Sequence, residues 1–392
     1  MKHNINILLV GLGSEIGSTL ISLVNKEKKN IKIKAILTNK ISLTDKKKIF
    51  ESLRARLVLN EPNLLGSIKY DLEKSLLIIS QNKIKVFWGD FKKFNLKKID
   101  FKFDAAIVAT STTHINNKTL MRKLLKISRY VFGAAEAENL PSVYPNLLNV
   151  NSNLIENKAK NIFNIKEKVF ALGSCQTNGW LAQLRAIIEV IKKLKISNAK
   201  IIGCELDIVH PDTAQGRLGT KSIEARDQDA RNNLRPGFSQ VDKSMRKLFL
   251  KSYKLNTISL RTLTVPPGYQ ISRFYIKFHN SYLKKFTKKN LKKNIEETSK
   301  NNKFIYSFSD NSLGSRAFEK IETAAVILTD DKYLHLTDNF LELTCKEKNH
   351  TISRVILQSY VHNTRGYCRS VIETIKKIVK MSNLKNKKIN CW

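Results

Sequence analysis

Short apolar runs that end in small residues mark the first half of the chain. Residues 4–10 (NINILLV) form the first run and stop at glycines, as a buried parallel strand does. A helix is expected to start near Ser14, with Ile16 and Leu20 on its apolar side. A second strand is predicted over residues 31–37 (IKIKAIL).

The strand pattern returns three times before the middle of the chain. Residues 104–112, 129–135 and 168–175 are each apolar and end in small or hydroxyl residues. Residues 41–100 are polar and lysine-rich, apart from short apolar stretches such as SLLIIS and IKVFWG. Because buried strands alternate with helical segments, the pattern predicts an α/β fold with a doubly wound parallel sheet.

The pattern changes after Cys175. A long amphipathic helix is predicted over residues 177–195, and the strands that follow are rich in β-branched residues. Residues 366–384 are amphipathic and close this half with a helix. The second half is therefore predicted to be α+β with a mixed or antiparallel sheet. Its strands are expected at 199–210, 256–266 and 273–281, with a strand pair at 322–331 and 336–347.

Length and hydropathy limit the class of protein. The chain has 392 residues, 42% of them hydrophobic, which predicts two domains with cores of their own. No run of about 18 apolar residues occurs, so we expect no membrane-spanning helix and no membrane partner. The basic and then apolar N-terminus runs into a glycine turn rather than a cleavage site, so we interpret it as a strand of a cytoplasmic protein.

The five cysteines do not form a recognisable framework. Their number is odd, their spacings are wide and no CxxC pair occurs, so neither a disulfide set nor a metal site is expected. A reducing cytoplasm is the natural setting for such a sequence. The five are Cys175, Cys204, Cys345, Cys368 and Cys391.

The formal net charge of +37 has two interpretations. A nucleic-acid binder would account for it, and so would the codon bias of an AT-rich genome, since lysine, asparagine and isoleucine are all abundant. The lysines are scattered through every segment, without an arginine-rich block or a basic stripe interleaved with aromatic residues. We therefore expect no specific nucleic-acid partner, although weak, salt-sensitive adsorption to polyanions would follow from the charge alone.

A glycine-rich turn connects the first strand to the first helix. Its spacing, G-x-G-x-x-x-G, is one residue longer than the common dinucleotide fingerprint. Glycines there let backbone amides approach a pyrophosphate, whose charge the helix N-terminus favours. An ordinary tight turn would look the same, but the position after the first strand favours a dinucleotide site. We expect this site to use Gly11, Gly13, Ser14, Glu15, Ile16 and Gly17.

The end of the second strand bears on the choice of dinucleotide. An acidic residue there would bind the ribose hydroxyls, but the strand ends in Thr38-Asn39-Lys40 and has no carboxylate. Lys40 and the missing negative charge would tolerate a 2′-phosphate, and Lys40 is equally well explained as one more surface lysine. With Asn39 and Lys40 as candidate contacts, NAD and NADP both remain open as the cofactor.

The segment Ser174-Cys175-Gln176-Thr177-Asn178 carries the clearest chemistry. Cys175 follows an apolar strand and opens a helix, and the partial positive charge of a helix N-terminus stabilises a thiolate. A buried structural cysteine is the alternative, because an unreactive cysteine packs as a small hydrophobic residue. The polar neighbours of Cys175 favour the nucleophile.

This segment resembles the S-C-x-T-N active-site motif of the glyceraldehyde-3-phosphate dehydrogenase family, and the likeness extends over most of the chain. Thr110-Ser111-Thr112 resembles the family's Ser-Thr-Gly beside the nicotinamide ribose. Residues 336–340 (LTDNF) are similar to its Leu-Asn/Ser-Asp-Asn-Phe stretch, and residues 363–367 (NTRGY) to its Asn-Glu-Tyr-Gly-Tyr. The order and spacing of these matches are together more specific than any one of them.

Within this resemblance, His210 matches the histidine that pairs with the cysteine. It is followed by PDTAQ, which is similar to the family's His-Ala-x-Thr-Ala-Thr-Gln segment shortened by one residue. A histidine near the thiol can accept its proton and stabilise a hemithioacetal oxygen. The resemblance also assigns Thr110, Ser111 and Asn363 to the cofactor, and Ser174, Gln176, Thr177, Thr213 and Ser239 to the substrate or phosphate.

The resemblance implies a domain organisation and an activity. It implies a Rossmann-type NAD(P)-binding domain over residues 1–174, a catalytic domain over 175–364, and a helix of about residues 365–392 that packs back on the first domain. The implied reaction oxidises a small-molecule aldehyde through a Cys175 hemithioacetal and thioester, which inorganic phosphate or water then releases. Since the family is usually tetrameric, a homo-oligomer (tetramer or dimer) is expected.

Departures from the family pattern concern the substrate. Thr264 stands where the family has an arginine for the substrate phosphate, Gln176 where it has a threonine at the inorganic phosphate site, and Thr364 where it has a glutamate. Two alternatives therefore stay open: a divergent aldehyde dehydrogenase with another substrate, and a catalytically weak relative that binds nucleotides or polyanions. Either a second anion site or a solvated loop would account for Arg217, Arg226, Arg231 and Arg235.

Overall fold

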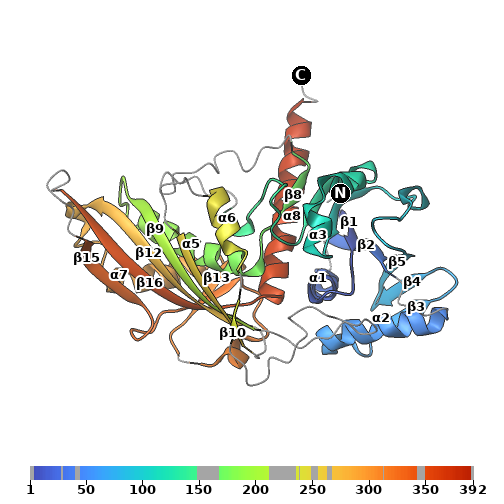
Figure 1. Cartoon of the computed structure of the whole chain (residues 1–392), viewed down its shortest axis with the longest axis horizontal. Helices are drawn as coiled ribbons and strands as arrows, with labels where there is room; N and C mark the ends of the chain where they lie inside the picture. The colour runs from blue at the N-terminus through green and yellow to red at the C-terminus, as the bar shows by residue number, and fades with distance from the viewer. Residues whose placement is uncertain are drawn as a thin grey trace.

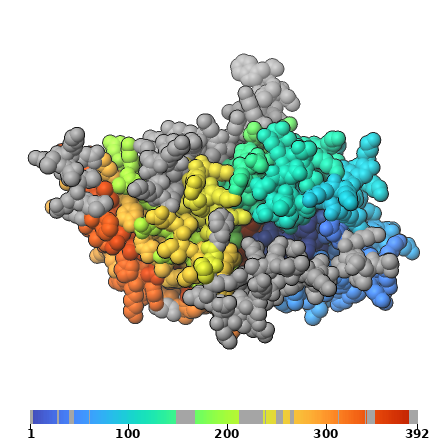
Figure 2. Space-filling model, in the orientation of Figure 1, coloured from blue at the N-terminus to red at the C-terminus, as the bar shows by residue number. Residues whose placement is uncertain are grey.

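Two β-sheets lie side by side, and the C-terminal helix stands between them (Figure 1). In Figure 2 the dark blue N-terminal residues are set back between the cyan-green surface of the first sheet and the yellow surface of the second half. The fold is seen in a computed structural model that describes residues 4–27, 30–39, 45–147, 167–211, 235–237, 239–248, 255–262, 267–311, 313–341 and 349–389.

The first sheet is mostly parallel. Among the described residues its strand order is β3-β4-β5-β2-β1-β6-β7-β8, in which β4 is antiparallel to both β3 and β5 and the other neighbouring strands pair in parallel. The order reverses at β1, because the chain continues to β2 on one side and later returns to β6 on the other. The strands are β1 (Ile5–Val10), β2 (Ile31–Thr38), β3 (Ile68–Asp71), β4 (Leu76–Ile79), β5 (Asn82–Trp88), β6 (Phe103–Val108), β7 (Ser128–Gly133) and β8 (Val169–Ala171).

Both faces of this sheet are buried. Ile7 and Leu9 of β1 belong to a core shared with α1, α2 and α8, whereas Leu8 and Val10 belong to a core shared with α3 and α4. Alternate side chains of one strand therefore enter different cores, which explains the unbroken apolar run of β1. The helices are α1 (Glu15–Lys26), α2 (Lys46–Asn60), α3 (Thr112–Asn116), α4 (Lys118–Lys123) and α8 (Arg365–Ile389).

The second sheet is mixed. Its order is β10-β11-β9-β12-β16-β14-β13, and β15 also pairs with β16. Side chains of α5 (Cys175–Lys193), α6 (Val241–Leu248) and α7 (Lys288–Ser299) share one core with a single face of this sheet. The strands are β9 (Lys200–Pro211), β10 (Arg235–Pro236), β11 (Leu255–Thr262), β12 (Gly268–His279), β13 (Tyr306–Ser309), β14 (Ala325–Leu328), β15 (His335–Leu341) and β16 (His350–Val361).

One predicted pairing is wrong. The two segments expected to form a strand pair are β14 and β15, but both pair with β16 instead of with each other. β16 is long enough for β15 to pair along residues 352–356 and β14 along 359–361, so the two lie one after the other on the same edge. A short connection between two strands therefore did not make them neighbours in the sheet.

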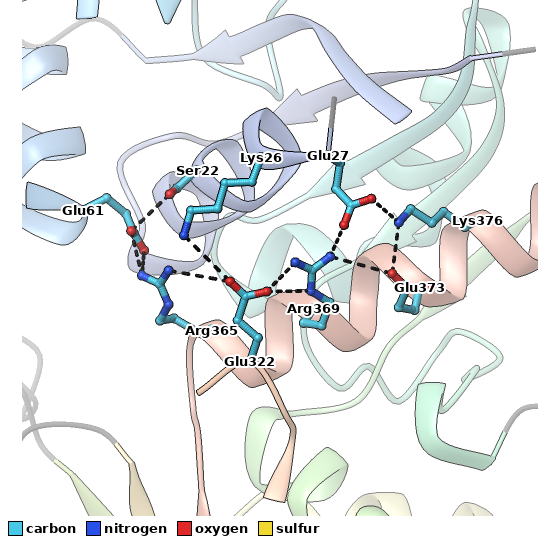
Figure 3. Close-up of polar contacts among 9 residues, drawn as sticks. All are labelled: Ser22, Lys26, Glu27, Glu61, Glu322, Arg365, Arg369, Glu373 and Lys376. Atoms are coloured by element: carbon cyan, nitrogen blue, oxygen red, sulfur yellow. Dashed lines mark hydrogen bonds and ion pairs between the residues drawn. The ribbon is translucent and has the colours of Figure 1, made fainter. Parts of the chain in front are cut away.

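A chain of alternating charges ties α8 to α1 and α2 (Figure 3). Arg365, the first residue of α8, donates to both carboxylate oxygens of Glu61 at 2.7 Å, and Ser22 of α1 donates to the same carboxylate at 3.1 Å. Arg369 lies one turn further along α8 and bonds both Glu27 and Glu322. Lys26, Glu373 and Lys376 complete the network.

Candidate functional site

The glycine turn lies at the carboxyl ends of β1 and β6. Gly11 has φ +95°, a left-handed conformation that favours glycine, and a Cβ there would come within 2.5 Å of Thr110 Cγ2. Ser14 caps α1 by accepting the Gly17 amide at 3.1 Å, and it donates to the Ala109 carbonyl at 2.9 Å. The two hydrogen bonds of Ser14 thus join the start of α1 to the end of β6.

Close backbone packing explains the other glycines of the turn. A Cβ on Gly17 would lie 2.2 Å from the Gly11 carbonyl oxygen, so a side chain would push α1 away from the turn. At Gly13 the nearest neighbour is the guanidinium of Arg56 in α2, whose Nη1 lies 2.8 Å from the Cβ position. Glu15 is the first residue of α1, and Ile16 packs against the core. Arg56 adds a positive charge that the sequence prediction did not include.

The remaining cofactor candidates of the first sheet lie at strand ends. Asn39 is exposed directly after β2, and Lys40 lies outside the described residues. Thr110 follows β6, where its hydroxyl is 3.1 Å from Nδ1 of His114. Ser111 is the N-cap residue of α3, and its hydroxyl is 2.7 Å from that of Thr113. These residues and the glycine turn share the edge at which the strand order reverses, where α/β sheets commonly bind ligands.

Cys175 opens α5 at a tightly held turn. Gly173 has φ +73°, and its carbonyl accepts a 2.9 Å hydrogen bond from the phenol of Tyr367 in α8. Ser174 caps α5 by accepting the Thr177 amide at 3.1 Å. Asn178 donates from its side-chain amide to the Leu172 and Ser174 carbonyls, both at 3.1 Å. The half-buried Cys175 is therefore carried by a turn that is fixed on both sides.

A buried amide network joins this turn to the second sheet. Gln176 donates from Nε2 to Oδ1 of Asn363 at 2.8 Å, and Gln270 of β12 donates to the Gln176 carbonyl at 2.9 Å. Gln183, two turns along α5, donates to Gln270 at 3.0 Å. Asn363 is 6% exposed, and its Nδ2 has no hydrogen-bond partner among the described residues. One buried donor at the end of β16 is thus available to a ligand.

His210 lies at the same end of the second sheet. Cys204, Leu206 and Ile208 of β9 alternate in the core under α5, so the period of the strand puts His210 on that face. A Cβ added to Gly268 of β12 would lie 2.7 Å from Cδ of Pro211 and 3.5 Å from Nε2 of Gln176, so these two residues lie close to each other. The fold therefore brings the first turn of α5 to the strand end that carries His210.

The tautomer of His210 follows from its contact with the backbone. Nδ1 is 2.6 Å from the Pro211 carbonyl oxygen, which can only accept, so Nδ1 carries the proton in the neutral ring. Nε2 is then an acceptor, as a general base requires.

The remaining candidate residues belong to the second half of the chain. Ser239 precedes α6, where its hydroxyl accepts the Val241 amide at 3.2 Å. Arg235 lies in β10, at the edge of the second sheet. Thr213, Thr264, Arg217, Arg226 and Arg231 lie outside the described residues.

The sequence prediction missed a buried charged cluster beside the turn. Glu136 follows β7 and is 3% exposed, and Lys247 of α6 donates to it at 2.7 Å. The only local signal was a glutamate among small residues after a buried strand, in GAAEAEN. Its lysine partner is 111 residues away in the sequence, so the pair could be recognised only in the fold.

In the described part of the chain, no group of three or more His, Cys, Asp or Glu side chains is placed to hold a metal ion. No helix within those residues has the length and apolar character needed to cross a bilayer. No model of a known protein family matches the chain, and no curated protein sequence matches it either.

Proposed function

We propose that the chain is a divergent relative of glyceraldehyde-3-phosphate dehydrogenases and oxidises an aldehyde with NAD or NADP. The observation that carries the proposal is the setting of Cys175. Its helix turn is bonded to α8 through Tyr367 and to the end of β16 through Gln176 and Asn363. A cysteine at a helix N-terminus, close to a strand end with a histidine acceptor, suits covalent catalysis on a carbonyl.

Two features of the chain fit a nicotinamide dinucleotide. The strand order of the first sheet reverses at β1, as in Rossmann-type sheets, and Gly13 of the glycine turn at that point is exposed, where a diphosphate could meet the backbone. At the other end of the site, Asn363 has a buried amide donor that a nicotinamide carbonyl would satisfy. When bound, NAD or NADP would supply the hydride acceptor of the reaction.

The chain's own residues account for the other steps. The Cys175 thiolate attacks the aldehyde carbon, and the carbonyl π electrons move to oxygen to form a hemithioacetal. Nε2 of His210 first accepts the Cys175 thiol proton and gives it to that oxygen, which backbone amides at the start of α5 also stabilise. Nε2 takes the same proton back as hydride leaves the carbon. The product is a thioester on Cys175. Attack by water or inorganic phosphate then expels the thiolate and releases the acid or acyl phosphate.

The proposal can be tested by turnover. Purified protein is mixed with glyceraldehyde-3-phosphate and NAD or NADP, with and without inorganic phosphate, and dinucleotide reduction is recorded by absorbance. We expect Cys175→Ala to lower the rate by about a thousand-fold or more, because the covalent route is lost. Cys204→Ala serves as the matched control, since Cys204 is a buried core cysteine.

Each alternative predicts a different outcome. Turnover that needs phosphate would identify the phosphorylating reaction, and turnover without phosphate would identify hydrolysis. A protein that binds dinucleotide but reduces it only with other aldehydes would have a different substrate. Equal turnover in the parent and Cys175→Ala proteins would contradict the proposal. Loss of both dinucleotide binding and turnover, with salt-sensitive binding to polyanions, would favour the weak relative.

A further inference from the structure

Glu136 is the centre of a buried polar cluster between β7 and α6. Its carboxylate accepts hydrogen bonds from Lys247 at 2.7 Å and from Ser142 and Tyr144 at 2.9 Å each. Ser244 of α6 donates to Oε2 of the same carboxylate. Four side-chain donors and the Ala137 amide at 3.2 Å thus surround one carboxylate that is shielded from water.

Hydroxyl groups continue this cluster to the turn that carries Cys175. The Ser244 hydroxyl is 2.9 Å from the Thr177 hydroxyl, which in turn is 2.9 Å from the Ser174 hydroxyl. Ser244 and Thr177 are fully buried. Ser174 is the N-cap of α5 and immediately precedes Cys175. A continuous hydrogen-bonded path therefore runs from Glu136 to the residue next to the thiol.

The carboxylate fixes the direction of every hydrogen bond along this path. A carboxylate only accepts, so the single proton of Ser244 points to Glu136. Ser244 must then accept from Thr177, whose single proton is used in that bond. Thr177 in turn accepts from Ser174, and Ser174 accepts the Thr177 amide. Neither hydroxyl at the start of α5 has a proton left for a ligand.

We propose that Glu136 is a positioning residue for Cys175. Acting through Ser244, its carboxylate keeps the hydroxyl protons of Thr177 and Ser174 turned toward itself, so that neither can donate to a thiolate or to an anion bound beside it. The charge at the helix start is then stabilised by backbone amides and by the histidine of β9 instead. This inference rests on the proposed function only in taking Cys175 as the reacting group.

Other ionisable groups near the two ends of the path come from several elements. Lys247 of α6 and Tyr144 face Glu136, and burial raises the pKa of Tyr144, so its phenol remains a donor. Tyr367 and Cys368 of α8 are electrostatically coupled to Cys175, but burial raises the pKa of both well above the ordinary values. His210 lies on this side too, at the end of β9.

The test compares two serines that donate to the same carboxylate. Ser244→Ala cuts the path, whereas Ser142→Ala removes an equivalent bond to Glu136 and leaves the path intact. The rate of Cys175 alkylation by iodoacetamide is measured against pH, and the modified peptide, residues 169–185 after trypsin, is quantified by mass spectrometry. This readout needs neither an aldehyde nor a dinucleotide, so it is independent of whether turnover is found.

We expect the pH midpoint of alkylation to fall in Ser244→Ala and to stay unchanged in Ser142→Ala. Without Ser244, Thr177 can turn its proton to Ser174, and the Ser174 proton becomes available to the thiolate. A hydrogen bond to a charged group corresponds to a shift of about one pH unit. In a Ser174→Ala background the Ser244 substitution should produce no shift, because the released proton is missing.

Three results would overturn the proposal. The first is the same midpoint in the parent protein, Ser244→Ala and Ser142→Ala. The second is a shift that persists when Ser174 is alanine, since the cause would then be a general change in the turn. The third is a Cys175 peptide that is not alkylated at any pH in the parent protein. Thermal unfolding of each variant shows whether a changed midpoint accompanies a fold that is otherwise retained.

Discussion

His362 and Asn363 are adjacent at the end of β16 but differ in their hydrogen bonding. Nε2 of His362 donates to the Glu319 carbonyl at 2.6 Å, and Nδ1 accepts the Arg365 amide at 3.2 Å, so both ring nitrogens are used within the chain. Asn363 uses its oxygen to bind Gln176 and keeps a buried donor. One residue thus uses both polar atoms within the chain, whereas the next has a buried donor with no partner among the described residues.

His362 should make folding sensitive to mild acid. Burial lowers the pKa of His362 to about 4, whereas the unfolded chain has the ordinary value near 6.5. The neutral ring therefore contributes stability at pH above about 6.5. As the pH falls toward about 4, this contribution is lost and the unfolding free energy drops by about 3 kcal/mol. We expect His362→Gln to reduce the pH dependence of the unfolding free energy in that window, as measured by urea denaturation.

A matched control separates this effect from general acid sensitivity. His335→Gln changes an exposed histidine and should leave the pH dependence of stability as it is in the parent protein. Parallel curves for the parent protein and His362→Gln would contradict the role of His362.

Local sequence identified the thiol turn but not the groups that orient it. Ser174 and Asn178 bond backbone groups within a few residues of themselves, so a short segment contains their chemistry. Glu136 bonds Lys247 and Ser244, which are more than a hundred residues away. Arg56 likewise reaches Gly13 only because α2 folds against the glycine turn. Long-range polar partners of this kind leave no pattern in a single sequence.

At the scale of elements, prediction succeeded where one strand is buried on both faces. β1, β2, β6, β7 and β8 all fall within apolar runs of the sequence. The region over residues 41–100 instead contains α2 and the antiparallel strands β3 and β4, which were not assigned. The buried residues of α2, Ile49, Phe50, Leu53 and Leu57, do have helical spacing, but the lysines and arginines between them obscured it.

The ion pair between Arg365 and Glu61 should be the strongest single tie between α8 and α2. The Glu61 side chain is 2% exposed, so removing its cation would leave a buried charge with only Ser22 as a polar partner in Figure 3. We expect Arg365→Met to lower the unfolding free energy by about 3–5 kcal/mol, measured by chemical denaturation. Arg246→Met, which breaks an exposed pair within α6, should cost less than about 1 kcal/mol.

A second substitution tests the stated cause. If the loss in Arg365→Met comes from an uncompensated carboxylate, then Glu61→Gln in the same chain should restore a large part of the stability. No recovery in the double variant would mean that Arg365 acts through packing, and an equal loss in Arg246→Met would contradict the importance of burial.

At the scale of the whole molecule, the two faces of the second sheet differ. One face is buried under α5, α6 and α7. The opposite face of β12 and β16 presents side chains that are only half-buried, among them Tyr269, Ile271 and Ile356. Ile258 of β11 is paired with Asp207 on the same face and is 61% exposed. A half-buried sheet face that carries both apolar and charged side chains suits contact with another protein surface.

We propose that a second copy of the chain covers this face, as the resemblance to an oligomeric family implies. The face contains both Arg273 and Asp207, which form an ion pair at 2.7 Å, so it can meet its own copy without repulsion between like charges. Mass measurement by light scattering should give a multiple of the chain mass for the parent protein. Ile258→Lys should shift it toward the single chain, because burying an unpaired ammonium at an interface is costly.

The control uses a residue of similar exposure elsewhere. Leu65 is 57% exposed next to α2, so Leu65→Lys adds the same charge without touching the second sheet. A single-chain mass for the parent protein would contradict the proposed contact. A multimer that Ile258→Lys leaves intact would place the contact on another surface. If only Ile258→Lys dissociates, the half-buried strand face is the contact surface, and the general positive charge of the molecule is excluded as the cause of dissociation.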